Sequence, residues 1–281
     1  MSNEVRIAIP SKGRLREDCL KLLRQAGYPT SGFHGGGSIA EIQGLSFIEM
    51  RPRDAAAAIE AGQLSAAFLA TDIVMEHDLE ALPALPLGFS RSTLVVASRD
   101  DDGRSSVADL AGSVVATHLP ELTRRFFGER GIDVRVVSMG GSLEGVCSAG
   151  LADAIVDLRE TGTSLMMNRL RVLEEIRECQ ALFVRQAEVP ALDDFTLRVE
   201  AVLSARRHRY VMLHLPQDRV HELSTVFPGL ASPTVLPLAE RDDLVAVHFV
   251  VRSDELWSRL SDLRAMGATG IVALEPQALL P

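Results

Sequence analysis

The sequence has few aromatic residues, few cysteines and no long apolar run. Only 5% of its 281 residues are Phe, Tyr or Trp, and its three cysteines, Cys19, Cys147 and Cys179, are far apart. Because no CxxC pair is present and the number of cysteines is odd, the sequence predicts buried thiols rather than a disulfide framework or a zinc site. No stretch of about 18 apolar residues occurs, and no charged-then-apolar leader precedes VRIAIP, so we expect a cytoplasmic chain that does not span a membrane.

An excess of basic residues is also missing. The 29 Lys and Arg residues are outnumbered by 38 Asp and Glu residues, which gives a net charge of -9. This charge opposes nonspecific binding to nucleic acid or to anionic membranes, and we expect neither as a partner. An anionic substrate must therefore meet a local basic patch.

Aliphatic residues, glycine and proline are plentiful. Hydrophobic residues make up 47% of the chain, which also has 21 glycines and 13 prolines. This composition is typical of alternating strands and helices, and the length suffices for two or three domains with separate cores. The sequence therefore predicts a soluble α/β protein.

Strand and helix patterns alternate through the first two thirds of the chain. A β-rich run at 5–9 is followed by the loop PSKGR and by an amphipathic helix, LREDCLKLLRQAG. Further strands are predicted in Leu45–Met50 and LSAAFLA, with a helix in RPRDAAAAIEAG between them. A similar unit begins near Phe89, and after Gln180 come the strand ALFVR and a basic amphipathic helix, DDFTLRVEAVLSARRHR. A parallel sheet explains the first unit most economically.

The last seventy residues have the pattern of a small split βαβ module. The order is a strand in YVMLHLP, a helix in DRVHELSTVF, strand segments around VAVHFVV, a helix in DELWSRLSDLRAMGA and a final strand in GIVAL. Helical spacing predicts that Trp257, Leu260 and Leu263 form a core stripe. The proline-rich segment PGLASPTVLPL reads as a turn or connection.

The stretch ADAIVDLRETGTSLMMN carries the chemistry that points most clearly to a ligand. If AIVDL is a strand, Asp157 lies near its carboxyl end, and ETGTS forms a loop whose amides and hydroxyls can bind phosphate. Gly162 allows close backbone approach, and the hydroxyls come from Thr161, Thr163 and Ser164. Asp153 and Asp157 would suit two ribose hydroxyls or Mg²⁺. The alternative is that the hydroxyl-rich loop merely caps a helix.

This stretch resembles the phosphoribosyl diphosphate loop of phosphoribosyltransferases, and GLADAIVDLRETGTSLMMNRL resembles that of the ATP phosphoribosyltransferase family. IPSKGRL, RPRDAAAAIEAG, LAGSVVATHLPELTRRFF, MGGSLEG and RYVMLHLP resemble the same family in the same order. PGLASPTVLPL and LRAMGATGIVAL resemble the regulatory domain of its long form.

The resemblance implies both an architecture and a reaction. It implies a two-domain, periplasmic-binding-protein-like catalytic part, with one domain in 1–90 and 180–206 and the other in 91–179. A ferredoxin-like regulatory domain would occupy 207–281. The family transfers phosphoribosyl from phosphoribosyl diphosphate to N1 of ATP, with Mg²⁺, in the first step of histidine biosynthesis. Its long form assembles from dimers into hexamers and binds histidine as an effector.

The resemblance also assigns roles to residues of this chain. Asp153 and Asp157 are predicted to be catalytic and to hold the metal ion, and the donor is predicted to bind Glu160, Thr161, Gly162, Thr163 and Ser164. The acceptor and the diphosphate are predicted to bind Lys12, Arg14, Arg51, Asp72, Gly141, Ser142 and Glu144. The regulatory site is predicted to involve Asp218, Thr234 and Ala268.

One segment departs from the family pattern. SAAFLATD has Ala67 and Ala70 where the family has glycines and Thr71 where it has Arg or Glu. Two alternatives to the ATP-dependent enzyme therefore remain open from the sequence. One is a related enzyme with a different acceptor, and the other is a non-catalytic binding or regulatory protein.

Overall fold

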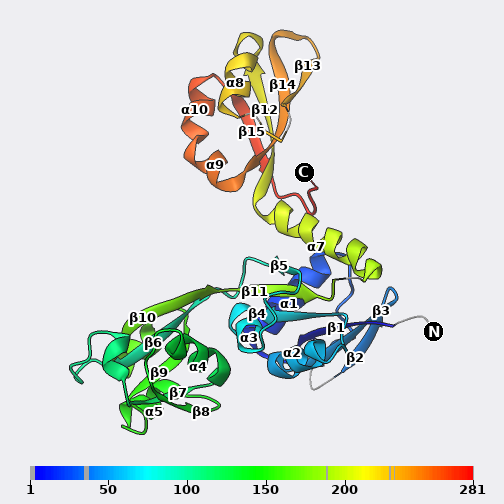
Figure 1. The fold of residues 1–281 in the computed structure, drawn as a ribbon. Helices are drawn as coiled ribbons and strands as arrows, with labels where there is room; N and C mark the ends of the chain where they lie inside the picture. The colour runs from blue at the N-terminus through cyan, green and yellow to red at the C-terminus, as the bar shows by residue number, and fades with distance from the viewer. Residues whose placement is uncertain (1–3, 35–37, 188, 228, 231, 281) are drawn as a thin grey trace. The chain divides into compact units, whose positions relative to one another are not determined.

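The computed structural model describes residues 4–34, 38–187, 189–227, 229–230 and 232–280 (Figure 1). The chain divides into two compact units, Met1–Lys21 with Tyr28–Ala191 and Leu22–Gly27 with Leu192–Pro281. The first unit contains two sheets, which we call the first and second lobes, and the second unit contains a third sheet. Among the described residues, no helix is long and apolar enough to cross a bilayer.

The first lobe is built on a six-stranded sheet with the order β2-β3-β1-β4-β11-β5. Its central strand β1 pairs in parallel with β3 and β4, whereas β2 and β11 pair antiparallel with β3 and β4. The sheet is thus mixed rather than purely parallel. Its strands are β1 (Val5–Pro10), β2 (Ile39–Ile42), β3 (Leu45–Met50), β4 (Ala66–Ala70), β5 (Ala84–Pro86) and β11 (Ala181–Arg185). Its helices are α1 (Gly13–Gln25), α2 (Pro52–Glu60) and α3 (Thr71–Glu76), of which α1 continues into the second unit.

The second lobe is built on a five-stranded sheet with the order β10-β6-β9-β7-β8. Here β7 pairs in parallel with β8 and β9, and β6 pairs antiparallel with β9 and β10. Its strands are β6 (Ser92–Arg99), β7 (Val114–Thr117), β8 (Arg135–Ser138), β9 (Ala154–Arg159) and β10 (Leu170–Cys179). Its helices are the 3₁₀ turn η1 (Val107–Leu110), α4 (Pro120–Gly128), α5 (Leu143–Ser148) and α6 (Thr163–Met167).

Strand β10 has no counterpart in the sequence-based prediction. Its sequence, LRVLEEIREC, carries charged side chains at half of its positions, which hides the alternation of a strand. The strand lies at the edge of its sheet, where it pairs with β6 alone among the described strands, and its register with β6 shifts twice. Charged side chains are tolerated at such an edge. It leads directly into β11 of the first lobe (Figure 1).

Parallel pairing brings the predicted ligand-binding segments to one edge of each lobe. In the first lobe Pro10 pairs with Met50, so the loops after β1 and β3 lie together, and β4 ends at the same edge. In the second lobe Thr117 pairs with Ser138 and Val156, so the segments after β7, β8 and β9 share an edge. Carboxyl edges of parallel strands are the usual place for ligands.

The C-terminal sheet has the predicted ferredoxin-like topology. Its strand order is β13-β14-β12-β15 and all its pairs are antiparallel. The elements are β12 (His208–Pro216), the 3₁₀ turn η3 (Gln217–Arg219), α8 (Val220–Val226), β13 (Thr234–Leu238), β14 (Arg241–Arg252), α9 (Ser253–Ser258), α10 (Leu260–Ala265) and β15 (Thr269–Leu274). The predicted architecture of two periplasmic-binding-protein-like sheets followed by this module is therefore confirmed.

Three local expectations for the C-terminal part are corrected. The proline-rich segment contains strand β13, because Pro237 is tolerated on an edge strand next to a register shift; Pro228 and Ala231 of this segment lie outside the described residues. The predicted single helix is broken at Arg259 into α9 and α10. Trp257, predicted to be in the core, is 63% exposed, and Leu256 is buried instead.

Helix α7 (Asp193–Arg206) also differs from expectation. It is not amphipathic, since its buried residues include five consecutive positions, 201–205, which cover every face of a helix. Helix α7 belongs to the same compact unit as the C-terminal sheet. The resemblance instead predicted that 180–206 belongs to the first catalytic domain.

Candidate active site

The loop after β9 enters α6 through a glycine in the left-handed conformation. Gly162 has φ of +80°, a left-handed conformation that residues with a Cβ rarely adopt, and it directly precedes α6. The hydroxyls of Thr161 and Thr163 lie 3.1 Å apart, and both side chains are exposed. Ser164 donates a hydrogen bond to Glu144 at the start of α5. Residues 160–164, which we call the donor loop, therefore present their hydroxyls to solvent, as does the loop before α5.

Asp157 lies on β9, three residues before this loop begins. One of its oxygens accepts a hydrogen bond from the Leu158 amide at 2.8 Å and lies 3.4 Å from Nδ1 of His118. Burial raises the pKa of Asp157, and the nearby carboxylates of Glu144 and Asp72 act in the same direction. A partly buried carboxylate beside a phosphate-binding loop can accept hydrogen bonds from ribose hydroxyls.

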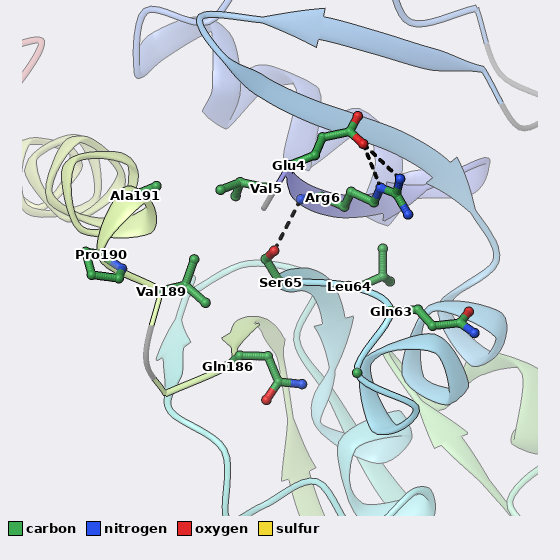
Figure 2. A pocket seen from close by; sticks show the side chains of 11 residues that line it. Glu4, Val5, Arg6, Gln63, Leu64, Ser65, Gln186, Val189, Pro190 and Ala191 are labelled. Atoms are coloured by element: carbon green, nitrogen blue, oxygen red, sulfur yellow. Dashed lines mark hydrogen bonds and ion pairs between the residues drawn. The ribbon is translucent and has the colours of Figure 1, made fainter. Parts of the chain in front are cut away.

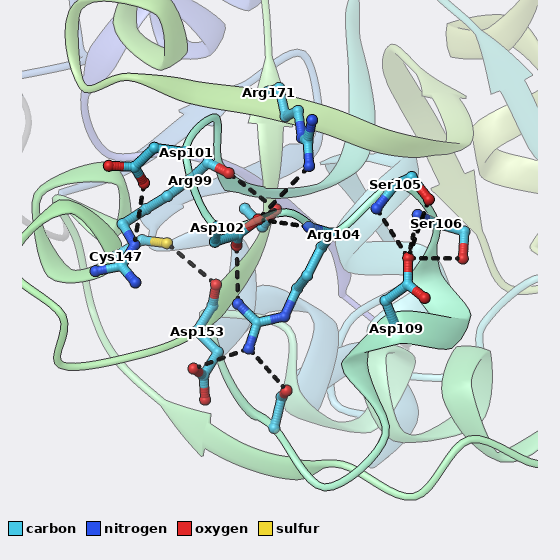
Figure 3. A network of polar contacts seen from close by, with 12 residues as sticks. Arg99, Asp101, Asp102, Arg104, Ser105, Ser106, Asp109, Cys147, Asp153 and Arg171 are labelled. Atoms are coloured by element: carbon cyan, nitrogen blue, oxygen red, sulfur yellow. Dashed lines mark hydrogen bonds and ion pairs between the residues drawn. The ribbon is translucent and has the colours of Figure 1, made fainter.

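The structure separates Asp153 from this site. Asp153 precedes β9, whereas the loop follows it, so Asp153 and Asp157 are about 13 Å apart along an extended strand. Oδ2 of Asp153 accepts from the Val114 amide at 2.9 Å, and Oδ1 accepts from Arg104 at 3.1 Å (Figure 3). Asp153 therefore lies at the end of β9 away from the loop, and the structure does not bring the two predicted catalytic aspartates together.

The pairing of Asp153 and Asp157 as ligands of one metal ion fails for the same reason. Among the described residues, no group of three or more His, Cys, Asp or Glu side chains is arranged to hold a metal ion. Asp153 is engaged by Arg104, and Asp157 faces His118. The residues present therefore do not build a protein metal centre, and any Mg²⁺ would need most of its oxygen ligands from the substrate and water.

The predicted basic residues of the first lobe lie at the edge where its parallel strands end. Lys12 is exposed in the loop after β1, and Arg51 is exposed immediately before α2. The Ser11 amide donates to the Met50 carbonyl at 2.9 Å, which holds these two loops together. Arg14 reaches the second lobe, where its guanidinium lies 2.7 Å from the Glu160 carboxylate of the donor loop. The ion pair joins predicted acceptor-side and donor-side residues.

The segment before α5 lies beside the donor loop. Gly141 and Ser142 are exposed, and Ser142 has φ of +52°, which is uncommon for a residue with a side chain. Glu144 accepts the hydrogen bond from Ser164. The structure thus places the segment of Gly141, Ser142 and Glu144, predicted to bind the acceptor or the diphosphate, beside the donor loop.

His118 is a site residue that the sequence reasoning missed. It directly follows β7, its Nδ1 lies 3.4 Å from Asp157 and its Nε2 lies 3.9 Å from Asp72 of the first lobe. Burial alone would lower the pKa of His118, but its interaction with Asp72 and the charge of Asp157 outweigh burial and raise it. The signal that could have found it is its position after a parallel strand next to the strand of Asp157.

Asp72 is buried rather than open to a ligand. Its residue is 2% exposed, and its Oδ1 accepts no hydrogen bond from the described part of the chain. It contacts His118 at the edge that carries the other predicted residues. Asp72 therefore faces His118 and is not exposed at this edge.

Two of the changed residues in SAAFLATD have structural partners in the first lobe. Ala67 is fully buried in β4 between Ala8 and Val184, so its methyl group lies in the sheet. Thr71 exchanges hydrogen bonds with the backbone of Gln180, at the junction of β10 and β11. Ala67 and Thr71 are thus accommodated by packing and by this junction.

A cavity of about 970 Å³ in the first lobe is not part of this site. It is lined by Glu4, Arg6, Gln63, Ser65 and Gln186, where β1 and β4 begin (Figure 2). That is the sheet edge opposite the predicted ligand-binding loops. A smaller cavity of about 290 Å³ includes Glu160, Arg91 and Gln180 and adjoins the donor loop.

Comparison with known proteins decides the family. The family model described as ATP phosphoribosyltransferase matches residues 51–207, and the model of the HisG C-terminal domain matches residues 205–276. The ATP phosphoribosyltransferase of Methanococcoides burtonii is 32% identical and that of Gemmatimonas aurantiaca is 35% identical, each covering 99% of this chain and 100% of the relative. The chain belongs to the ATP phosphoribosyltransferase family. It has the long form, with the C-terminal domain, so the prediction of a phosphoribosyl-transferring enzyme of histidine biosynthesis is confirmed.

A solved structure agrees with this family assignment. The ATP phosphoribosyltransferase HisG:HisZ complex from Thermotoga maritima contains a chain with a TM-score of 0.62 and 26% identity. The match covers 71% of the present chain and 98% of that chain.

The family's C-terminal domain carries the residues predicted to bind an effector. Asp218 lies in η3, and Ala268 is buried just before β15. Their segments are adjacent, since a Cβ on Gly267 would lie 3.2 Å from Pro216. Thr234 pairs with His248 of β14, whereas Pro216 pairs with Leu244, four residues away along the same strand. Thr234 is therefore not brought to Asp218. One copy of the module therefore does not assemble the three predicted residues into one site.

Proposed function

We propose that this chain joins C1 of phosphoribosyl diphosphate to N1 of ATP and releases pyrophosphate. The single observation that carries this proposal is the exposed, hydroxyl-rich loop around Gly162, with Asp157 just before it and basic residues of the first lobe opposite. The family assignment supports the reaction, which opens histidine biosynthesis.

The donor is proposed to bind in the second lobe. The amides and hydroxyls of Thr161, Thr163 and Ser164 would hold the 5-phosphate, and the left-handed Gly162 would let the backbone approach it. Asp157 would accept hydrogen bonds from the ribose hydroxyls. Its negative charge would also favour the positive charge that develops on the ribose ring as the C1–O bond breaks.

The acceptor and the leaving diphosphate are proposed to bind between this loop and the first lobe. Lys12, Arg14 and Arg51 would neutralise phosphate oxygens, and the loop at Gly141 and Ser142 offers further amides. Arg14, now paired with Glu160, would exchange this exposed partner for a phosphate. Positioning two bound substrates can contribute up to about 7–11 kcal/mol to lowering a barrier.

Mg²⁺ is proposed to enter with the substrate. Because the described residues build no metal centre, the ion would be carried as a complex with the diphosphate. It would supply charge neutralisation of the leaving pyrophosphate.

Regulation, assembly and location are also proposals. We propose that histidine binds the C-terminal module at Asp218 and Ala268 and that Thr234 is supplied by a neighbouring copy, since one module keeps these segments apart. A homo-oligomer, from dimer to hexamer, would provide that copy. A cytoplasmic location is consistent with three buried free cysteines.

The test is a pyrophosphate-release assay with phosphoribosyl diphosphate, Mg²⁺ and a series of acceptors. We expect ATP to support turnover and to yield a product whose mass is that of ATP plus the phosphoribosyl group. Other nucleotides and simple azoles serve as the comparison series. Turnover with one of these but not with ATP, or donor binding without any pyrophosphate release, would contradict the proposal.

A further inference from the structure

The amino end of α4 is held by a residue of the other lobe. The backbone N–H groups of Glu121 and Leu122 donate hydrogen bonds to the two carboxylate oxygens of Glu76, at 3.2 Å and 2.8 Å. Glu76 is the last residue of α3 in the first lobe and is 8% exposed, whereas α4 belongs to the second lobe. A buried carboxylate therefore bridges the two lobes.

The local sequence explains why α4 needs this partner. The N-cap residue Leu119 has no polar side chain to accept a hydrogen bond, and Pro120 at the first helical position has no N–H group. The next two amides are then the first free donors of the helix, and their burial without acceptors would be costly. The Glu76 carboxylate satisfies both amides and also complements the helix dipole.

Neighbouring contacts join the same two lobes. Arg125 of α4 donates to the Met75 carbonyl at the end of α3, and Arg53 of α2 donates to the His118 carbonyl just before α4. Ile73 and Val74 share one apolar cluster with residues of α4, namely Leu122, Phe126 and Phe127. Polar and apolar contacts thus fix α4 to the first lobe.

This attachment bears on the geometry of the active site. Helix α4 continues from β7 through His118, and β7 pairs with β9, whose end carries Asp157 and the donor loop. The proposed acceptor residues Lys12, Arg14 and Arg51 belong to the first lobe. Whatever fixes α4 to α3 therefore helps to set the spacing between the donor and acceptor halves of the site.

We propose that Glu76 is a positioning residue for phosphoribosyl transfer, which acts by capping α4 across the lobe boundary. The proposal rests on the proposed function in its kinetic part, whereas the cap itself can be tested without catalysis. Binding of the 5-phosphoribosyl part of the donor should not depend on Glu76, because the loop proposed to hold it lies within the second lobe. The encounter of donor and acceptor should depend on it.

The first experiment measures residue-resolved hydrogen exchange in the full-length protein. The variants are Glu76→Ala, Glu76→Gln and, as a control, Glu80→Gln, which changes an exposed glutamate four residues further along. We expect faster exchange at the amides of Glu121 and Leu122 in Glu76→Ala, a smaller change in Glu76→Gln, which retains one carbonyl acceptor, and no change in the control. Unchanged exchange at both amides in a folded Glu76→Ala protein would overturn the cap.

The second experiment separates donor binding from transfer. For Glu76→Ala we expect kcat/KM for ATP to fall by at least about tenfold, since misplacing reacting groups by about 1 Å can cost on the order of 100-fold. The Kd for ribose 5-phosphate, which lacks the diphosphate, should stay at the wild-type value when it is measured by calorimetry, and Glu76→Gln should recover part of the activity. A wild-type kcat/KM in Glu76→Ala, or a Kd that worsens as much as kcat/KM, would overturn the positioning role. An inactive wild type would instead contradict the proposed function. Hydrogen exchange would still show whether Glu76 caps α4.

Discussion

Asp157 and Asp153 are four positions apart on one segment, yet they belong to different parts of the molecule. Asp157 lies beside His118 and the donor loop. Asp153 instead accepts hydrogen bonds from Arg104 and from the amide of Val114. Sequence periodicity places both on the same face of a strand, and it cannot tell which end of the strand each occupies. At the residue scale, the boundary of β9 therefore decides which acid can meet a substrate.

Substituting the two aspartates separately tests this distinction. Asp157→Asn removes the charge facing the ribose, so we expect kcat/KM for phosphoribosyl diphosphate to fall about 10- to 150-fold, as for loss of a charge-assisted hydrogen bond. Asp153→Asn should leave steady-state kinetics unchanged and lower the free energy of unfolding by about 1–3 kcal/mol, because Arg104 and Val114 lose a charged acceptor. Equal kinetic losses in both variants would restore Asp153 to the site.

Gly162 is the second residue whose role can be isolated. Its φ of +80° disfavours any residue with a Cβ, and the nearest atom to such a Cβ would be 3.6 Å away on Arg159, in ordinary contact. The effect of Gly162→Ala is therefore conformational, with an expected loss of about 1 kcal/mol or more in stability.

We also expect a higher KM for phosphoribosyl diphosphate in Gly162→Ala, because the loop must shift to relieve the strain. Gly145→Ala is the matched control, since Gly145 lies inside the short helix α5 and a Cβ there meets no neighbour. Steady-state kinetics and thermal unfolding measure both variants. A Gly162→Ala protein with unchanged donor KM would show that the loop conformation is not needed for binding.

At the scale of elements, helices and strands with strong periodicity were predictable, and charged or proline-containing edges were not. β10 was missed because charged residues fill an edge strand, and β13 was taken for a connection because it contains Pro237. Both depend on a neighbouring strand for their structure, and a single strand's sequence does not reveal its partner. The donor loop was recognisable because its glycine and hydroxyls are local, whereas the bridge through His118 depends on tertiary contact.

The break between α9 and α10 predicts opposite effects at two adjacent residues. Leu256 is 1% exposed and belongs to the core of the C-terminal module, whereas Trp257 is 63% exposed. Leu256→Ala should destabilise the protein by about 2–5 kcal/mol. Trp257→Ala should change the free energy of unfolding by no more than about 0.5 kcal/mol. Chemical denaturation of both variants measures the difference, and a larger loss at Trp257 would support the single core-facing helix predicted from the sequence.

At the scale of the whole molecule, acid stability depends on the buried network in the second lobe (Figure 3). The side chain of Asp102 is 4% exposed and lies 2.8 Å from Arg104. Burial alone would raise the pKa of Asp102, but hydrogen bonds from the side chain and amide of Arg104 and from Ser98 outweigh burial and lower it. Its contribution to stability is therefore present above the unfolded-state pKa of about 3.9 and is lost as the pH falls through the lower folded-state value.

Asp102→Asn should reduce this acid dependence. We expect the variant to be less stable than the wild type at neutral pH and to lose less additional stability between about pH 4 and pH 2. Denaturant titrations over this range measure both slopes. An identical loss of stability on acidification in the two proteins would contradict the assignment of the low pKa to Asp102.

The molecule as a whole places a donor loop in one lobe, basic residues in the other and a separate C-terminal module after them. The family assignment could be predicted from the sequence because motifs along nearly the whole chain carry it. The contacts between the lobes could not be predicted. Glu76 lies outside the quoted motifs, and the motifs that contain Arg53 and His118 do not indicate which residues these two contact.

Calorimetric titration of phosphoribosyl diphosphate with Mg²⁺ into the wild type and into a Thr161→Ala, Thr163→Ala double variant tests the central claim most directly. If these hydroxyls hold the 5-phosphate, each lost charge-assisted hydrogen bond costs about 1.5–3 kcal/mol. The Kd should therefore rise at least about tenfold while the thermal unfolding temperature stays near the wild-type value, because both side chains are exposed. A double variant that binds the donor as tightly as the wild type would contradict the account.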